Sequence, residues 1–159
     1  MKDQEAYRIK RRNMPYYNQV VELVNSFDDC TSVLDVGGGP IDLLSRVNYP
    51  TLTLIDICDI KYFSGTFIHG DFLTTDVPNH DIVICLQVIE HIQDKQTFAA
   101  KLLATANKYL LVSIPYKWDI GDAEHDGLDE SDVVEWFVTP PTQYIRRKKS
   151  QRLFCLWEL

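Results

Sequence analysis

The chain has 159 residues, of which 16 are Lys or Arg and 23 are Asp or Glu, so its formal net charge is -7. A chain of this length matches one domain with a single hydrophobic core, and we expect one domain over residues 1–159. The acidic balance argues against generic binding to nucleic acid or to an anionic membrane and favours a small-molecule partner.

The N-terminal residues 1–13 are charged and contain no apolar stretch of the kind that secretory signals carry. No run of about 18 apolar residues occurs along the chain, so we predict a cytoplasmic protein without a membrane span. We expect residues 1–13 to form a solvated helical arm. Between Pro15 and Phe27, apolar residues recur at the spacing of one helical face, and Pro15 suits a first turn. An amphipathic helix is therefore predicted after the arm.

Five short runs rich in β-branched and aliphatic residues follow. They lack the polar alternation of half-exposed strands, which is typical of parallel strands that are buried on both faces. The five runs are residues 32–37, 51–57, 66–69, 81–88 and 109–114.

Helical patterns alternate with these strands. We expect a helix to begin in residues 41–47, directly after the first strand. A second helix is predicted within residues 94–107 with Asp94 as its N-cap, and a third within residues 128–137 with Asp129 as its N-cap. Alternating strands and helices predict an open α/β sheet.

The C-terminal residues 142–159 predict two strands around a turn at residues 148–151. The second arm, residues 153–157, is apolar on both faces, so we expect it inside the sheet and not at its edge. The sequence thus predicts a Rossmann-like, doubly wound α/β fold. Its sheet has seven mostly parallel strands with an antiparallel C-terminal strand, and helices on both faces make a three-layer sandwich.

The cysteines show no metal-ligand spacing, and we interpret them as reduced core residues. We expect no metal site. The four positions are Cys30, Cys58, Cys85 and Cys155.

Three consecutive glycines, Gly37, Gly38 and Gly39, follow the first predicted strand. Glycine allows a ligand to approach the main chain closely, and ligands of open α/β sheets bind beyond the carboxyl ends of the strands. The second strand ends in Asp56, 19 residues after Gly37, where a carboxylate can accept both hydrogens of a ribose diol. These residues predict a nucleoside-binding site.

Two more strand ends supply candidates at the same edge. Asp71 follows the third strand and can accept a hydrogen bond from an adenine amino group, with Phe72 against the ring. Leu86 and Gln87 end the fourth strand and would form the floor beside the reacting group.

The order of these motifs, "VLDVGGG", "LIDI", "GDF", "DIVICLQVIEHI" and "LLVSIPY", resembles the class I S-adenosylmethionine-dependent methyltransferases over about residues 14–159. The antiparallel last strand fits that family as well. The resemblance implies S-adenosylmethionine as cofactor and a methyl transfer that proceeds by in-line displacement. It implies that Asp35 and the three glycines face the methionine part, that Asp56 and Ile57 hold the ribose, that Asp71 and Phe72 frame the adenine, that Leu86 and Gln87 line the methyl end, and that Tyr16 or Tyr17 closes the pocket.

Two departures from the family pattern have structural consequences. Ile41, after Pro40, stands where the family carries its last loop glycine, so the following segment must pack differently. Residues 58–65 are too few for the helix that normally joins the second and third strands. One face of the sheet is then thinly covered, and an apolar patch there would offer a dimer surface.

The loop at residues 117–130 lies after the fifth strand, at the edge where substrate must arrive. For a hydroxyl acceptor, His is the usual general base, and we predict this role for His125, with Tyr116 as a second catalytic candidate. His91 is a weaker candidate, and His69 and His80 are interpreted as structural.

The acceptor is expected to be a small molecule that is methylated on oxygen or nitrogen. No N/D-P-P-Y pattern of base-methylating enzymes follows the fourth strand, and we expect no separate recognition domain. Two other interpretations remain open: a catalytically inactive cofactor-binding sensor or partner subunit with the same fold, and a dinucleotide-dependent dehydrogenase.

Overall fold

The computed structural model describes residues 3–159, so the first two residues of the predicted arm lie outside the described residues. No helix in the described part is long and apolar enough to cross a bilayer. The helices are α1 (Gln4–Arg11), α2 (Pro15–Asn25), α3 (Lys95–Thr105) and α4 (Glu130–Trp136), with three short 3-10 turns, η1 (Gly39–Ile41), η2 (Leu43–Arg46) and η3 (Ile89–His91).

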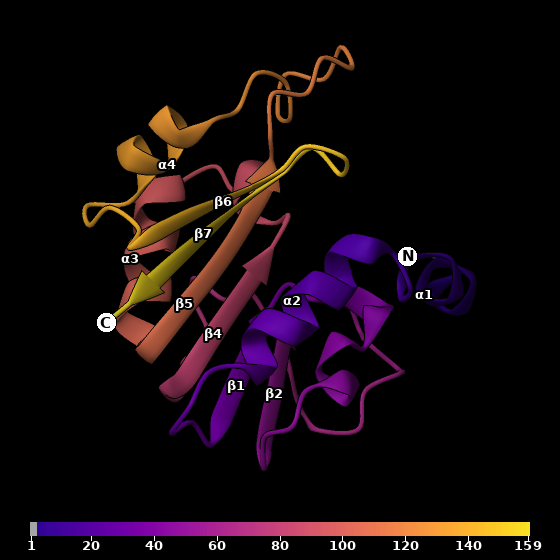
Figure 1. The fold of residues 1–159 in the computed structure, drawn as a ribbon. Helices are drawn as coiled ribbons and strands as arrows, with labels where there is room; N and C mark the ends of the chain where they lie inside the picture. The colour runs from indigo at the N-terminus through magenta and orange to yellow at the C-terminus, as the bar shows by residue number, and fades with distance from the viewer. Residues whose placement is uncertain (1–2) are drawn as a thin grey trace.

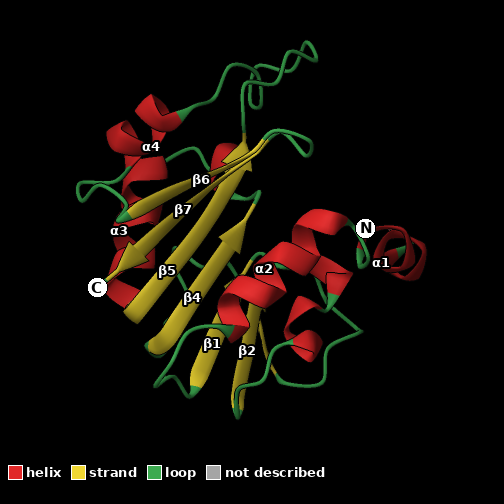
Figure 2. Cartoon of the chain, viewed as in Figure 1, coloured by secondary structure: helices red, strands yellow, loops and turns green. Residues whose placement is uncertain are grey.

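Seven strands form one sheet (Figures 1 and 2). Their order is β3-β2-β1-β4-β5-β7-β6, and β7 runs antiparallel to both of its neighbours, β5 and β6. The prediction that the last strand lies inside the sheet is confirmed. The strands are β1 (Ser32–Val36), β2 (Thr51–Asp56), β3 (Thr66–His69), β4 (His80–Leu86), β5 (Ala106–Pro115), β6 (Gln143–Arg147) and β7 (Arg152–Glu158).

Two clusters of buried side chains lie on opposite faces of this sheet. Helix α2 and the turns η1 and η2 cover one face, whereas α3 and α4 cover the other (Figure 1). Along β4 the side chains alternate as expected for a strand that is buried on both faces: Ile82 and Ile84 pack under α2, and Val83 and Cys85 pack under α3 and α4. The three-layer prediction is confirmed.

The predicted helix caps at α3 and α4 are present. The Asp94 carboxylate accepts a hydrogen bond from the backbone N–H of Thr97 at 3.0 Å. Asp129 and Asp132 form a reciprocal capping box at the start of α4. These side chains satisfy N–H groups that the first turn of a helix leaves without partners.

The prediction that a helix begins in residues 41–47 is wrong, because only the short turns η1 and η2 form there. The two turns are separated by Asp42, whose φ of +57° lies in the left-handed region. A left-handed residue interrupts a right-handed helix. Ile41 and Leu43 are buried on either side of it, so this segment still covers the sheet.

Residues 57–65, which join β2 to β3, form no helix, as expected. Helix α1 lies against this segment: Gln4 Nε2 donates to the Asp59 carbonyl at 2.7 Å, and the Arg8 guanidinium lies 5.1 Å from the ring centroid of Tyr62. The arm therefore packs on the segment that stands in place of the usual helix. Ile57 stays 72% exposed, and a dimer surface here stays a prediction.

Candidate functional site

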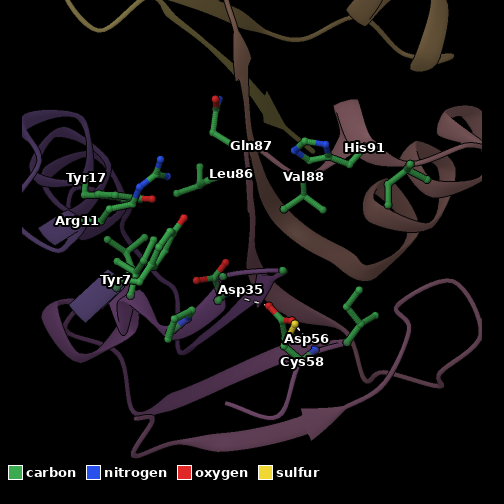
Figure 3. Close-up of a pocket in the computed structure, with 18 residues that line it drawn as sticks. Tyr7, Arg11, Tyr17, Asp35, Asp56, Cys58, Leu86, Gln87, Val88 and His91 are labelled. Carbon is green, nitrogen blue, oxygen red and sulfur yellow. Dashed lines mark hydrogen bonds between the residues drawn. The ribbon is translucent and has the colours of Figure 1, made fainter. Parts of the chain in front are cut away.

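A cavity of about 390 Å³ lies at the carboxyl ends of β1, β2 and β4 (Figure 3). It is large enough for a nucleoside cofactor, because small-molecule sites span roughly 300–1,000 Å³. Most of the predicted binding residues line it. They are Tyr17, Asp35, Gly37, Gly38, Gly39, Asp56, Ile57, Leu86 and Gln87.

The glycine loop is shaped by two close approaches. A Cβ at Gly38 would overlap Oδ2 of Asp35, and a Cβ at Gly37 would lie 2.7 Å from Cγ2 of Val88. The latter distance is shorter than van der Waals contact, and Gly37 also has a positive φ of +73°. Glycine is thus required at positions 37 and 38 by neighbouring side chains of the protein. The sequence had suggested only the approach of a ligand as the reason.

Asp56, at the end of β2, joins the two loops of the cavity floor. Its Oδ2 accepts from the Gly39 N–H at 2.9 Å, and its Oδ1 accepts from the Cys58 N–H at 2.8 Å. Only 9% of the residue is exposed. Each carboxylate oxygen has a second lone pair, so Asp56 can hold the loops and still accept hydrogen bonds from a ligand.

Asp35, at the end of β1, is 3% exposed, and its Oδ1 has no hydrogen-bond partner. Burial raises the pKa of this carboxyl to about 8, and the neighbouring Asp56 carboxylate adds to the rise. Loss of solvation and a nearby like charge both disfavour the ionised form. Asp35 is therefore largely protonated near neutral pH, and a cationic ligand group would favour its ionisation.

Gln87 and Leu86 form the wall at the end of β4. Gln87 has a positive φ of +57°, its N–H donates to the Ser113 carbonyl, and its Nε2 donates to Ser113 Oγ at 3.1 Å. Two hydrogen bonds to β5 compensate for the left-handed backbone, which is uncommon for residues other than glycine. Both residues therefore line the cavity, and their place beside the reacting group stays a prediction.

The N-terminal helices supply a wall that the sequence analysis found only in part. Tyr17 of α2 was predicted, but Tyr7 and Arg11 of α1 were not. The Arg11 guanidinium lies 4.9 Å from the ring centroid of Tyr7, so the two residues form one pair. Tyr7 and Arg11 are one helical turn apart, which could have predicted that they share one face of the helix. The basic residues around them favoured a solvated helix instead.

Four predicted site residues lie outside this cavity: Asp71, Phe72, Tyr116 and His125. Phe72 packs into the core under α3, with its ring 5.4 Å from that of Phe98. Asp71 is exposed, and its carboxylate accepts from the Leu73 N–H at 2.9 Å. Tyr116 continues the alternation of β5 and packs on the same core face. For Tyr116, the face of the sheet on which the side chain falls keeps it away from the cavity. Phe72 lies in the turn after β3, and its ring points into the core.

The loop at residues 117–130 is held by the Asp126 carboxylate. This carboxylate accepts the backbone N–H groups of Ile120, Gly121 and Asp122 at 2.8–2.9 Å. The resulting turn presents His125, whose ring centroid lies 4.8 Å from that of His91. His91 lines the cavity, so the predicted base lies next to the cavity wall and not in it.

Glu90, which was not among the predicted site residues, is buried beside these two histidines. Only 2% of Glu90 is exposed, and neither of its carboxylate oxygens has a hydrogen-bond partner. Burial raises the pKa of this carboxyl, and its own backbone N–H and the neighbouring His91, His125 and Arg152 act in the opposite direction. The sequence gives little sign of this arrangement, because His125 is far along the chain from Glu90.

No family model and no curated protein matches the chain by sequence. Solved structures match it by fold. The N-methyltransferase NodS from Bradyrhizobium japonicum WM9, in complex with S-adenosyl-L-homocysteine, superposes with a TM-score of 0.72 at 10% identity over 98% of both chains. The methyltransferase domain of bacterial CtHen1-C superposes with a TM-score of 0.72 at 16% identity, over 94% of this chain and 99% of that one.

Another solved structure holds S-adenosyl-L-homocysteine, as the NodS structure does. Magnesium protoporphyrin IX methyltransferase (ChlM) from Synechocystis PCC 6803, with bound S-adenosyl-L-homocysteine, has a TM-score of 0.66 at 15% identity, over 94% of this chain and 84% of that one. At such low identity the similarity establishes the fold, and the activity must be argued from the site.

Proposed function

We propose that the chain, which has the class I methyltransferase fold, is an S-adenosylmethionine-dependent methyltransferase that acts on a small-molecule acceptor. One observation carries the proposal: the glycine loop, Asp35 and Asp56 line a single cavity of about 390 Å³ at the carboxyl ends of the strands. In open α/β sheets this is where nucleotide ligands bind.

The cavity offers a matching group for each part of the cofactor. Asp56 and Ile57 take the ribose, and the glycine loop and Asp35 take the methionine part, with its ammonium group near the buried carboxyl. Arg11 brings a guanidinium to the same cavity and is placed to pair with the methionine carboxylate. Because Phe72 points into the core, we expect the adenine to lie against Ile57 and Cys58.

Methyl transfer is a displacement in which the acceptor atom forms a bond to the methyl carbon while the carbon–sulfur bond breaks and its electron pair stays on sulfur. The protein aligns the two reactants and excludes water. Leu86 and Gln87 line the methyl end. A second cavity of about 360 Å³, which shares His91 and Ile92 with the first, is the proposed acceptor side. Glu124 of the loop lines this side, and the next residue, His125, is the proposed base for a hydroxyl or amine acceptor.

A catalytically inactive cofactor-binding protein is the alternative that the glycine loop favours, because Ile41 stands in place of the family's last loop glycine. The two functions differ in one measurement. An enzyme releases S-adenosyl-L-homocysteine when it is incubated with S-adenosylmethionine and a panel of hydroxyl and amine acceptors. A sensor binds the cofactor and releases none.

The cofactor assignment is tested by isothermal titration of S-adenosyl-L-homocysteine into wild type and Asp56→Asn. We expect one site per chain and an affinity at least about tenfold lower in the variant, because a hydrogen bond to a charged group contributes about 1.5–3 kcal/mol. Asn also cannot accept from both the Gly39 and Cys58 N–H groups that Asp56 holds.

Asp59→Asn is the matched control, because this exposed carboxylate lies in the same β2–β3 segment and the residue's hydrogen bond to Gln4 uses its carbonyl. We expect its affinity to equal that of wild type. Thermal melting of each variant reports whether the loops stay folded. NADH binding that is tighter than S-adenosyl-L-homocysteine binding would contradict the assignment and favour a dehydrogenase.

A further inference from the structure

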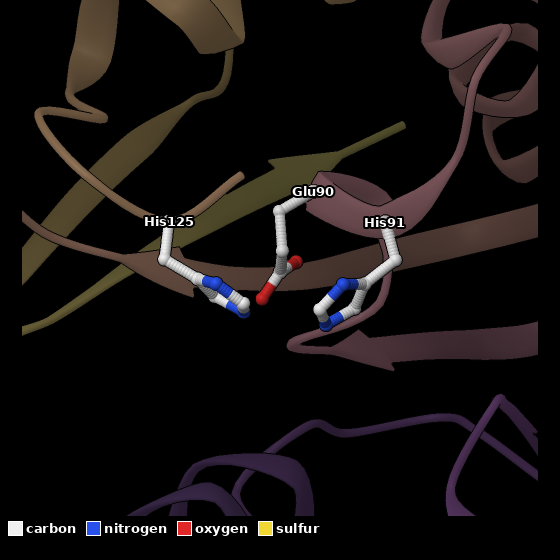
Figure 4. Close-up of side chains that lie close together, drawn as sticks. All are labelled: Glu90, His91 and His125. Atoms are coloured by element: carbon white, nitrogen blue, oxygen red, sulfur yellow. The ribbon is translucent and has the colours of Figure 1, made fainter. Parts of the chain in front are cut away.

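We propose that Glu90, His91 and His125 bind a divalent transition-metal ion, such as Zn²⁺, at the carboxyl edge of the sheet. One ligand atom from each of the three side chains lies within 4.8 Å of the other two. Glu90 and His91 belong to the turn η3 after β4, and His125 comes from the loop at residues 117–130. The Glu90 carboxylate points between the two imidazole rings (Figure 4).

The burial of Glu90 is an independent observation that points to a ligand. A carboxylate that is 2% exposed, with both oxygens unpartnered, is rare in a folded protein. Buried carboxylates are normally paired with a cation or coordinate a metal, because removing the charge from water is costly. An ion between Glu90 and the two rings would supply that compensation.

A carboxylate also lies beside each histidine. His91 Nδ1 is hydrogen bonded to Oε2 of Glu124 at 2.9 Å, whereas His125 Nδ1 lies 2.8 Å from Oδ2 of Asp122 without the geometry of a hydrogen bond. In metal sites a carboxylate commonly holds one ring nitrogen, which orients the imidazole so that its other nitrogen ligates. With Glu90, three carboxylates surround two histidines, and this excess of negative charge suits a divalent cation.

The donor atoms indicate the class of metal. Two imidazole nitrogens and one carboxylate oxygen favour Zn²⁺, Co²⁺ or Fe²⁺ over Ca²⁺ and Mg²⁺, which prefer oxygen ligands. Zinc bonds of about 2.0–2.1 Å place tetrahedral ligands about 3.4 Å apart. The three atoms must therefore close by up to about 1.5 Å, and His125, on its loop, is the ligand best able to move.

The ion would lie where the two cavities meet. His91 lines both cavities, and Glu90 and Glu124 line the second. Three protein ligands leave at least one coordination position open, as in catalytic metal sites. An oxygen atom of the acceptor would fill it, a role that rests on the proposed function. A histidine that ligates through its lone pair cannot also serve as the base, so His125 would then be a positioning ligand.

The test uses untagged, metal-free protein titrated with Co²⁺ and followed by calorimetry and visible absorption. We expect one ion per chain, with the spectrum of nitrogen and oxygen ligands and without the charge-transfer band that a Cys58 thiolate would add. Glu90→Gln and His125→Ala should each weaken binding at least tenfold. His69→Ala is the control, because it removes an exposed histidine outside both cavities, and its affinity should be unchanged.

Thermal melting with Zn²⁺ verifies that the variants fold and gives a second measurement. The ion should raise the melting temperature of wild type, since ligands stabilise the state that binds them, and leave that of Glu90→Gln unchanged. Absence of Co²⁺ binding by wild type up to about 1 mM, or a loss of less than tenfold in Glu90→Gln, would overturn the metal site. Failure of wild type to bind S-adenosyl-L-homocysteine would instead contradict the proposed function and leave the metal result intact.

Discussion

Replacement of Asp35 by Asn is expected to make the ligand-free protein more stable at pH 9 by about 3 kcal/mol or more, and to leave its stability nearly unchanged at pH 4. Burial and the Asp56 carboxylate raise the pKa of Asp35 from its ordinary value of 3.8 to about 8 in the folded chain. Between these two pH values the folded state binds one more proton than the unfolded state, so the stability of wild type falls as the pH rises.

The difference between the folded and unfolded pKa of Asp35 sets the direction of the pH dependence and the pH range over which it acts. Each pH unit between about 4 and 8 lowers the free energy of unfolding by at most about 1.4 kcal/mol, and above pH 8 the loss is complete. Asn carries no charge to bury, so the free energy of unfolding of Asp35→Asn does not fall with pH in this way. Urea unfolding at pH 4, 6, 8 and 9 measures it. Asp28→Asn, which alters an exposed side chain, is the control, and parallel curves for wild type and Asp35→Asn would contradict the explanation.

Cofactor binding should release the same proton. If the methionine ammonium group lies beside Asp35, it favours the ionised carboxylate, so S-adenosyl-L-homocysteine binding at pH 7 displaces a proton into the buffer. Calorimetry in two buffers of different ionisation enthalpy measures this release. The release should disappear in Asp35→Asn, and equal binding enthalpies for wild type in both buffers would place the ammonium group elsewhere.

The strands themselves could be predicted from the sequence because their strong signals are local. A strand buried on both faces is apolar throughout, so the five runs and the apolar arm of the C-terminal hairpin were visible without any knowledge of their partners. Asp94 and Asp129 marked the starts of α3 and α4, since capping depends on neighbouring residues alone.

The site was predicted less completely because it depends on which way side chains point. Phe72 and Tyr116 sit at strand ends, as a motif requires, but face the core under α3 and α4. A one-residue difference in a strand exchanges the two faces, and the end of a strand is where sequence patterns locate residues least well. Tyr7 reaches the cavity through the packing of α1, which its own charged surroundings did not indicate.

The proximity of Glu90 and His125 could not be predicted from the sequence for another reason. The loop conformation that brings His125 to Glu90 depends on three backbone N–H groups that converge on the Asp126 carboxylate. Such a turn leaves only a weak trace in residue types. Metal-ligand spacing is informative when ligands share one helix or loop, and here they come from two separate segments.

Replacement of Gly38 by Ala is expected to lower the free energy of unfolding by about 2–3 kcal/mol and the affinity for S-adenosyl-L-homocysteine by roughly 100-fold. The backbone of Gly38 has an ordinary φ of -65°, so Ala meets no conformational strain there. The cost arises because its Cβ would overlap Oδ2 of Asp35. The buried carboxyl must then move, and the space open to it is the cavity that the cofactor would fill.

Further variants distinguish this clash from a general inability of the loop to accept side chains. Gly39→Ala places a Cβ in open space at a φ of +59° and should cost only the left-handed strain of about 1–2 kcal/mol. The double variant Gly38→Ala/Asp35→Ala removes the atom that is struck, so it should be more stable than Gly38→Ala alone, although Asp35→Ala opens a small cavity. Urea unfolding of wild type, Gly38→Ala, Asp35→Ala and the double variant completes the cycle. Strictly additive changes in the free energy of unfolding would mean that Asp35 is not the reason for glycine at position 38. A smaller loss in the double variant than in Gly38→Ala would show that glycine is needed because a buried carboxyl lies against the main chain.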